Sequence, residues 1–149
     1  MTEPDIRLAR EADLPGILTL YGYLHPDEPP PEATAAEAAW SDLLSSGVTM
    51  PFVADIAGML VASCTLAIIP NLTRGARPYG VIENVVTHGE YRRTGLARAV
   101  LRTAIERAWS ANCYKVMFAT GSRREATLSF YEAVGFQRGS KTYFEIRRP

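Results

Sequence analysis

The segment from residue 81 to residue 101 constrains the fold more than any other part of the chain. Its sequence is V-I-E-N-V-V-T-H-G-E-Y-R-R-T-G-L-A-R-A-V-L. The apolar, β-branched run at 81–86 predicts a strand, and the glycine-bearing turn at 92–97 leads into apolar residues at helical spacing between 95 and 112. A strand, turn and helix in this order direct several backbone N–H groups and the positive end of a helix dipole toward one point. That arrangement binds phosphate or pyrophosphate.

Size, charge and cysteine content limit what the rest of the molecule can be. A chain of 149 residues suffices for a single domain, 1–149, with a core of its own. Sixteen basic and sixteen acidic side chains cancel, so we expect no nucleic-acid or membrane partner, and any anion site must be local. The longest apolar run, 59–69, is too short to span a bilayer, and the N-terminus lacks a signal-peptide core, which favours a cytoplasmic location. Cys64 and Cys113 form neither a disulfide framework nor a zinc pattern and are expected to be buried thiols.

The order of the remaining elements predicts a mixed sheet. Strands are expected at 6–8, 52–55, 59–69, 81–86, 115–119 and 143–146, and helices begin near Asp13, Ala33, Gly95 and Glu125, with Asp13 as an N-cap. A turn-rich segment at 70–78 connects two antiparallel strands. We therefore expect an α/β (α+β) fold, a single domain with a mixed, mostly antiparallel sheet of about six to seven strands flanked by four helices.

The turn at 92–97 has the residue types that a phosphate site requires. Gly95 lets the backbone approach a ligand, and Ala97 is small enough for tight packing of the helix start. Arg92, Arg93 and Arg98 add guanidinium groups, whose donors match phosphate oxygens. The same six residues also fit an ordinary glycine turn with solvated arginines. Neither a P-loop nor the three-glycine dinucleotide fingerprint matches.

Two motifs resemble those of the GCN5-related N-acetyltransferase (GNAT) family. R-R-T-G-L-A at 92–97 is similar to its Q/R-x-x-G-x-G/A motif, and F-Y-E-A-V-G-F at 130–136 is similar to its F-Y-x-x-x-G-F signature. I-E-N-V-V at 82–86 and C-Y-K at 113–115 also resemble the glucosamine-6-phosphate N-acetyltransferase branch. The resemblance covers essentially the whole chain. It implies a GNAT-like fold, acetyl-CoA as cosubstrate, and no metal.

The resemblance also assigns cofactor-binding residues. Backbone groups of Val85 and Val86 would bind the pantetheine arm as an added strand does, and Thr120 and Ser122 would line the same cleft. The family's asparagine seven residues before its tyrosine is replaced here by Arg124. The pyrophosphate would be surrounded by the amides of the whole turn, namely Arg92, Arg93, Thr94, Gly95, Leu96 and Ala97.

Two side chains are the candidates for proton transfer. Glu83, on the strand that enters the turn, is the candidate base acting through a water molecule, although a carboxylate there could equally face solvent or pair with an arginine. Tyr131 is the candidate acid for the departing thiolate, because a phenol with an ordinary pKa of about 10 can protonate it, and the alternative is a core aromatic. The Val85 N–H would stabilise the oxyanion. His88 fits a second base or a surface turn residue, and Asn84 fits acceptor binding or a satisfied strand edge.

The leading interpretation is an enzyme that moves an acetyl group directly from acetyl-CoA to the primary amine of a small molecule. The alternatives are a non-catalytic acyl-CoA-binding or regulatory module and a peptide or protein N-acetyltransferase. Arg74 and Arg77, in the turn before the key strand, fit recognition of an anionic acceptor or solvated loop charges. Tyr21 and Trp40 fit a wall of the acceptor cleft, although helical spacing favours core packing. Dimerisation through the C-terminal strand is common among the relatives, so a homodimer is an expectation from the resemblance.

Overall fold

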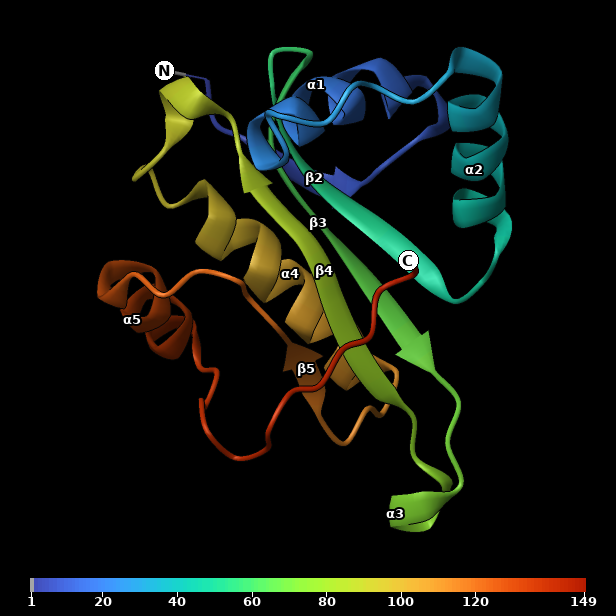
Figure 1. The fold of residues 1–149 in the computed structure, drawn as a ribbon, viewed down its shortest axis with the longest axis vertical. Coiled ribbons are helices and arrows are strands. Elements are labelled where there is room, and N and C mark those ends of the chain that lie inside the picture. Colours follow the sequence, from blue (N-terminus) through green and yellow to red (C-terminus); the bar gives the residue numbers. More distant parts are fainter. Residues whose placement is uncertain (1) are drawn as a thin grey trace. The chain divides into compact units, whose positions relative to one another are not determined.

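The computed structural model describes residues 2–149, which form two compact units, one ending at Phe118 and the other spanning Ala119–Pro149. The first unit holds every strand of the sheet (Figure 1). The strands are β1 (Asp5–Leu8), β2 (Thr49–Ile56), β3 (Met59–Ile69), β4 (Tyr79–Thr87) and β5 (Val116–Phe118). The helices of this unit are η1 (Glu11–Asp13), α1 (Leu14–Leu24), α2 (Ala33–Ser45), α3 (Thr73–Ala76), η2 (Gly89–Tyr91) and α4 (Leu96–Ser110). The second unit contains α5 (Glu125–Val134).

The sheet is mixed and mostly antiparallel, as the sequence predicts. Its strand order is β1-β2-β3-β4-β5, and only the β4–β5 pair is parallel. The hairpin between β2 and β3 turns at Ala57 and Gly58, which both have positive φ (52° and 89°), the geometry that two-residue hairpins favour. A helix, α4, connects the two parallel strands, as a parallel crossover requires.

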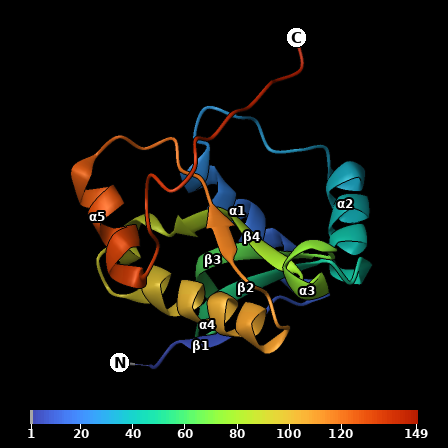
Figure 2. The ribbon, with the colours of Figure 1, turned by 90° about the horizontal axis from the view of Figure 1, so that it is seen from below.

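Helices cover both faces of the sheet, α1 and α2 on one side of the strands and α4 on the other (Figure 2). Side chains alternate between the faces of a strand, so β3 contributes to both layers. Cys64 faces α4, where its thiol lies 3.9 Å from the carbonyl oxygen of Val100. The layer beneath α1 and α2 is a separate apolar cluster of Ile17, Leu20, Trp40, Val53, Leu60 and Val86. Trp40 is therefore a core residue, and Tyr21 packs against the same cluster.

The strand predicted at residues 143–146 is not formed, so the sheet has five strands rather than six or seven. A strand requires a neighbour that satisfies its N–H and C=O groups, and within the second unit residues 143–146 pair with no other strand. Apolar content alone therefore does not produce a strand there. The side chains stay exposed, with Phe144 86% and Ile146 99% accessible.

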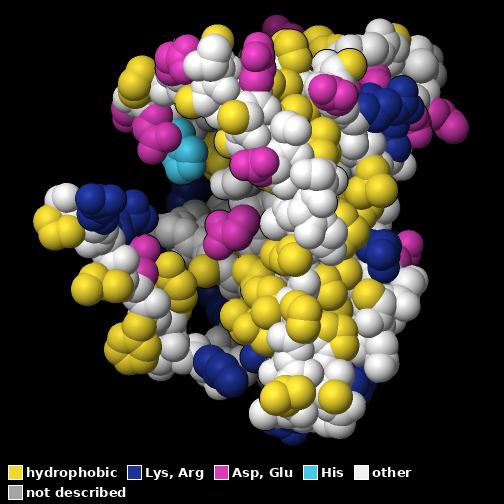
Figure 3. All heavy atoms as spheres, turned by 90° about the vertical axis from the view of Figure 1, so that its right-hand side faces the viewer, with side chains coloured by type: hydrophobic (Ala, Val, Ile, Leu, Met, Phe, Trp, Pro, Cys, Tyr) yellow, Lys and Arg dark blue, Asp and Glu magenta, His cyan; other side chains and the backbone are white. Residues whose placement is uncertain are grey.

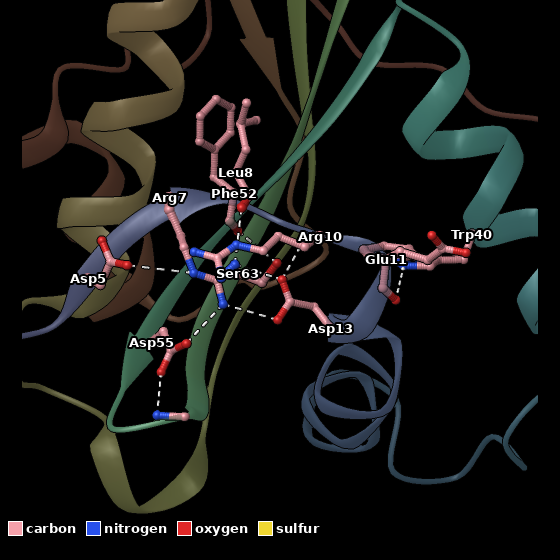
Figure 4. Close-up of polar contacts among 11 residues, drawn as sticks. Asp5, Arg7, Leu8, Arg10, Glu11, Asp13, Trp40, Phe52, Asp55 and Ser63 are labelled. Atoms are coloured by element: carbon pink, nitrogen blue, oxygen red, sulfur yellow. Dashed lines mark hydrogen bonds and ion pairs between the residues drawn. The ribbon is translucent and has the colours of Figure 1, made fainter.

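An arginine ties the start of the chain to the sheet (Figure 4). Arg7 of β1 donates to Asp13 at 2.7 Å and to Asp55 of β2 at 2.9 Å, and its side chain is only 13% exposed. Asp13 also accepts from the N–H of Arg10 at 2.7 Å. Asp13 occupies the N-cap position of α1, as predicted, but its carboxylate makes no cap hydrogen bond to that helix because it is bound by Arg7 and Arg10. The hydrogen bond from Arg7 lowers the pKa of the Asp13 carboxyl.

The thiols and the surface agree with the composition. Cys64 and Cys113 are both buried and free, and burial raises the pKa of Cys64 to about 12. On the face drawn in Figure 3, acidic and basic side chains intermingle at the surface, as expected for a chain without net charge. None of the helices in residues 2–149 is long and apolar enough to cross a membrane.

Candidate active site

β4 loses its parallel neighbour partway along its length. The pairing with β5 runs from Gly80, opposite Val116, to Ile82, opposite Phe118. On the other side, β3 stays paired with β4 as far as Thr87. From residue 83 onward, the β5 side of β4 has no strand partner in residues 2–149. Backbone groups on such an edge are available to an extended ligand that binds as an added strand would.

β4 also carries a bulge where this open edge begins. The register with β3 shifts between Ser63 and Thr65, so that Asn84 and Val85 together lie opposite Cys64. Asn84 has φ 55°, a left-handed conformation that asparagine tolerates better than most residues. Bulges of this kind redirect side chains and end regular pairing, and they are frequent next to active sites.

The two sides of the bulge have different environments. Val86 is 6% exposed and belongs to the cluster beneath α1. Glu83 is exposed, and because it lies directly opposite Thr65 it shares that residue's face of the sheet. Its carboxylate forms no ion pair within residues 2–149, so the alternative of a carboxylate paired with an arginine is wrong. The assignment of Glu83 as a base stays a prediction.

The turn between β4 and α4 has the backbone of an anion site. Arg93 and Gly95 have φ 63° and 83°, and alternation of ordinary and left-handed residues creates concavities lined by N–H groups. The carbonyl of Gly95 accepts the first helical bond, from Ala99 at 3.0 Å. The N–H groups of the first turn that follows Gly95 therefore have no partner inside the helix. Both the amides and the dipole favour an anion here.

Two guanidinium groups stand free beside this turn. Arg92 and Arg93 are exposed, and neither forms an ion pair within the described part of the chain. Leu96, by contrast, is buried, and it fixes the start of α4 against the sheet. The turn therefore combines a fixed helix start with uncompensated positive charge.

His88 stabilises the approach to the turn. Its Nδ1 accepts the N–H of Glu90 at 3.2 Å, and its Nε2 lies 3.2 Å from the hydroxyl of Tyr23 in α1. Its ring also packs edge-on against Tyr91, with centroids 5.5 Å apart. Because Nδ1 already accepts a backbone N–H, His88 acts as a cap of η2 in this structure. This favours the interpretation of His88 as a turn residue over that of a base.

In the second unit, Thr120 and Ser122 shape the entry to α5. The Thr120 hydroxyl accepts the N–H of Ser122 at 3.1 Å, and the Ser122 hydroxyl accepts the N–H of Arg124 at 3.3 Å. Both hydroxyls thus stabilise the local turn. Their place beside a cofactor remains a prediction.

The F-Y-E-A-V-G-F motif forms the end of α5. Gly135, with φ 127°, ends the helix, and the N–H of Phe136 returns to the carbonyl of Tyr131 at 3.1 Å. The Tyr131 ring packs edge-on between Phe130 and Phe136, with centroid distances of 5.1 Å and 6.3 Å. The glycine therefore has a local structural role, and the aromatic neighbours fix the orientation of the tyrosine. Its assignment as an acid stays a prediction.

Two features of the first unit were not resolved from the sequence. Arg77 donates to the carbonyls of Asn112 and Cys113 at 3.3 Å and 3.5 Å, which ties it to the residues that follow α4. Arg74 is exposed like Arg77, and its guanidinium lies 5.7 Å from the centre of the Tyr114 ring. The second feature is the bulge at Asn84 in β4, which only the pairing with β3 reveals.

A strand with one open edge, followed by a turn whose backbone can bind an anion, fits an extended ligand that carries a phosphate. The family model described as Acetyltransferase (GNAT) family matches residues 17–136. The chain therefore belongs to the GNAT family and is an acyltransferase. No group of three or more His, Cys, Asp or Glu side chains that could bind a metal occurs among residues 2–149.

The chain is also similar to individual acetyltransferases. A glucosamine 6-phosphate N-acetyltransferase of Trypanosoma brucei brucei is 36% identical over 135 residues, which cover 89% of this chain and 88% of that protein. A structure described as an acetyltransferase from Agrobacterium tumefaciens strain C58 is 47% identical, with a TM-score of 0.92 over 97% of this chain and 99% of that one. An aminoglycoside N-acetyltransferase in complex with CoA shares the fold alone, at 18% identity and a TM-score of 0.82 over 100% of this chain and 97% of that one.

Proposed function

We propose that the protein transfers an acetyl group from acetyl-CoA to the primary amine of a small, anionic acceptor. The observation that carries the proposal is the open edge of β4 beyond Ile82, which leads directly into the turn with the exposed Arg92 and Arg93. An extended arm that ends in a pyrophosphate fits this order, because the arm can bind along the open edge and the pyrophosphate at the turn. The CoA bound to the aminoglycoside N-acetyltransferase of the same fold supports the proposal.

The chain's own groups fit such a cosubstrate in order along the strand. Val85 and Val86 lie on the unpaired stretch of β4, where their backbone groups would hydrogen-bond the pantetheine arm. The pyrophosphate would accept hydrogen bonds from the N–H groups of residues 92–97 and from the guanidinium groups. Thr120 and Ser122 are further candidate residues for contacts with this arm. When bound, acetyl-CoA supplies a thioester with an activated acyl carbon.

Proton transfers fall to two residues in this proposal. An acceptor amine must be neutral to attack the acyl carbon, and Glu83 would accept its proton through a water molecule. The new C–N bond forms as the C–S bond breaks, and Tyr131 would give its phenolic proton to the departing thiolate. The N–H of Val85 would stabilise the negative charge that develops on the acyl oxygen.

For the acceptor we propose a phosphorylated amino sugar, with glucosamine 6-phosphate as the first compound to test. The name of the Trypanosoma relative, at 36% identity over most of both chains, supports this choice. Arg74 supplies an exposed positive charge in the loop before β4. A phosphate on the acceptor would be attracted by such a charge.

The experiment is a CoA-release assay with acetyl-CoA and a panel of glucosamine 6-phosphate, glucosamine, an aminoglycoside and a peptide with a free N-terminus, combined with isothermal titration of acetyl-CoA. We expect binding of acetyl-CoA and release of CoA only with the phosphosugar. Release with the peptide instead would replace the acceptor assignment. Binding without release by any amine would favour an acyl-CoA-binding module, and absence of binding would overturn the cofactor assignment.

Variants separate the two proton-transfer roles. Tyr131→Phe retains the ring that packs between Phe130 and Phe136, so we expect a folded enzyme with a kcat about 100-fold lower. Glu83→Gln should also reduce kcat at least tenfold while acetyl-CoA still binds, again on the usual scale of lost acid–base catalysis. Wild-type turnover in either variant would remove the role of that residue, and Phe130→Leu serves as the control for aromatic packing.

A further inference from the structure

His88 connects three elements of the first unit at the point where β4 ends. Its backbone N–H donates to the carbonyl of Val61 in β3 at 2.8 Å. Its ring binds η2 through Nδ1, which accepts the N–H of Glu90 at 3.2 Å, and its Nε2 lies 3.2 Å from the hydroxyl of Tyr23 in α1. A neutral imidazole has one donor and one acceptor nitrogen. Because Nδ1 accepts, the proton is assigned to Nε2, which donates to the Tyr23 hydroxyl.

Tyr23 is a fixed support for this imidazole. It lies in the last turn of α1, a helix that the buried Ile17 and Leu20 anchor in the apolar cluster. The rings of Tyr23 and His88 lie against each other, with centroids 4.6 Å apart. The contact depends on a glycine, because a Cβ at Gly89 would lie 2.9 Å from Cε1 of Tyr23. The φ of Gly89 is not positive, so the approach of the tyrosine ring, and not the backbone conformation, requires glycine there.

The segment that His88 caps continues directly into the turn at 92–97. The carbonyl of His88 accepts the N–H of Tyr91 at 2.9 Å, and the carbonyl of Tyr91 accepts the hydroxyl of Thr94. Between them, Arg93 has φ 63°, a conformation that costs energy for a non-glycine residue and persists only where neighbouring structure holds it. The turn is therefore supported through η2, and the side chain that caps η2 is that of His88.

We propose that Tyr23 and His88 are positioning residues for acetyl-CoA, because Tyr23 fixes the His88 ring, His88 caps η2, and η2 holds the turn in the conformation that receives the pyrophosphate. A turn that is ordered in advance loses less conformational freedom on binding, so its support lowers the Kd. The proposal rests on the proposed function for the identity of the ligand. The hydrogen bonds that link α1, His88 and η2 are properties of the protein alone.

The first test compares two substitutions at His88. His88→Ala removes both ring contacts, whereas His88→Asn keeps an oxygen that can accept the N–H of Glu90, since asparagine is a favoured N-cap residue. We expect the Kd for acetyl-CoA in isothermal titration to rise about five- to tenfold in His88→Ala and only about two- to threefold in His88→Asn. His25→Ala is the matched control, because His25 is exposed and forms no side-chain hydrogen bond within residues 2–149. An unchanged Kd in a folded His88→Ala protein would overturn the proposal.

Kinetic constants distinguish positioning of the turn from a general loss of packing. In His88→Ala the KM for acetyl-CoA should rise with the Kd, while kcat at saturating acetyl-CoA and glucosamine 6-phosphate should stay within about twofold, because Glu83 and Tyr131 are untouched. A residue with a merely structural role would lower the stability and leave both constants of the folded protein unchanged. A lower kcat at constant KM would contradict a role in binding acetyl-CoA.

A double-mutant cycle tests whether Tyr23 acts through His88. Tyr23→Phe keeps the ring and removes only the hydroxyl beside Nε2, so we expect the Kd for acetyl-CoA to rise about two- to threefold. In the His88→Ala background, the same exchange should change the Kd by less than about 1.5-fold, because the partner of the hydroxyl is already gone. Equal losses of affinity in both backgrounds would show that Tyr23 does not act through His88.

Amide hydrogen exchange needs no ligand and keeps the two proposals separable. The N–H of Glu90 is bound by Nδ1 of His88, so its exchange rate should rise at least about fivefold in His88→Ala. The rate should stay near the wild-type value in His88→Asn and His25→Ala. If the wild-type protein bound no acetyl-CoA, the proposed function would fail, while these rates would still test the link between His88 and η2. Equal rates in the wild type and a folded His88→Ala protein would refute that link.

Discussion

Two groups of arginines in the first unit show how the same side chain serves structure or binding. Arg7 is 13% exposed and is neutralised by Asp13 and Asp55 at 2.7 Å and 2.9 Å. Arg92 and Arg93 are exposed and have no carboxylate partner in residues 2–149. Both groups lie where a strand is followed by a helix. They differ in whether the chain itself supplies the anion.

The difference identifies which positive charge is available to a ligand. The donors of Arg7 are used by two carboxylates that fasten β1 to β2 and η1 (Figure 4). The Arg92 and Arg93 donors remain unused beside a helix start whose N–H groups are also unpaired. The number of arginines therefore does not show which of them can bind a ligand. An arginine paired with carboxylates stabilises the fold, whereas an unpaired one is available to bind an anion.

The largest expected effect is on stability, from Arg7→Ala. This variant leaves Asp13 and Asp55, with side chains 12% and 19% exposed, as like charges without their common partner. We expect the free energy of unfolding to fall by about 3 kcal/mol, measured by urea denaturation. Acetyl-CoA affinity of the folded fraction should be unchanged. Arg93→Ala is the control and should alter stability by less than about 0.5 kcal/mol.

The next effect is on binding, from the combined Arg92→Ala and Arg93→Ala variant. Two charge-assisted hydrogen-bonding groups at a phosphate are lost, so we expect the Kd for acetyl-CoA to rise about 30-fold in isothermal titration. The weakening of binding with added salt should also become less steep. Wild-type affinity in the double variant would show that the free arginines are ordinary surface charges and would break the comparison.

Acid should affect the Arg7 network more than the turn. The pKa of Asp13 is lowered in the folded protein, mainly by its hydrogen bond from Arg7, so this carboxylate contributes stability above its unfolded pKa of about 4. That contribution is lost as the pH falls through the lower folded value, with a slope of at most about 1.4 kcal/mol per pH unit for one proton. Thermal unfolding between pH 7 and pH 2.5 measures it.

Asp13→Asn is the informative control for this acid effect. The variant is less stable than wild type at neutral pH, but it should lose less stability on acidification because the titrating group is gone. The double variant at Arg92 and Arg93 should follow the wild-type profile. If Asp13→Asn and the wild type lost stability in parallel, the network would not be the source of the acid sensitivity.

Prediction from the sequence succeeds where the signal is local and fails where it depends on residues far apart in the chain. The sequence predicts β3 with the bounds Met59–Ile69 that the structure shows, because a long apolar run between turns is a local signal. The motif likewise predicts the turn at Gly95 from which α4 begins, and the structure adds that Gly95 has φ 83°. The strand at 143–146 was predicted wrongly, since pairing depends on a neighbour that composition does not reveal. The bulge at Asn84, with φ 55°, depends on the pairing of β4 with β3, and only an asparagine inside a strand indicates it in the sequence.

The smallest expected effects come from replacing arginine by lysine, and they sharpen the comparison because charge is kept. Arg7 binds Asp13 through both Nη1 and Nη2 and binds Asp55 through Nη2, and an ammonium group cannot reproduce that geometry. Arg7→Lys should therefore cost about 1–2 kcal/mol of stability in urea denaturation. At the exposed turn, a ligand adjusts to a point charge more easily, so Arg93→Lys should raise the Kd for acetyl-CoA only about two- to threefold. If Arg7→Lys left the stability unchanged while Arg93→Lys strongly weakened acetyl-CoA binding, the guanidinium geometry would matter more at the turn than in the Arg7 network. Pairing within the chain would then no longer distinguish the two groups of arginines.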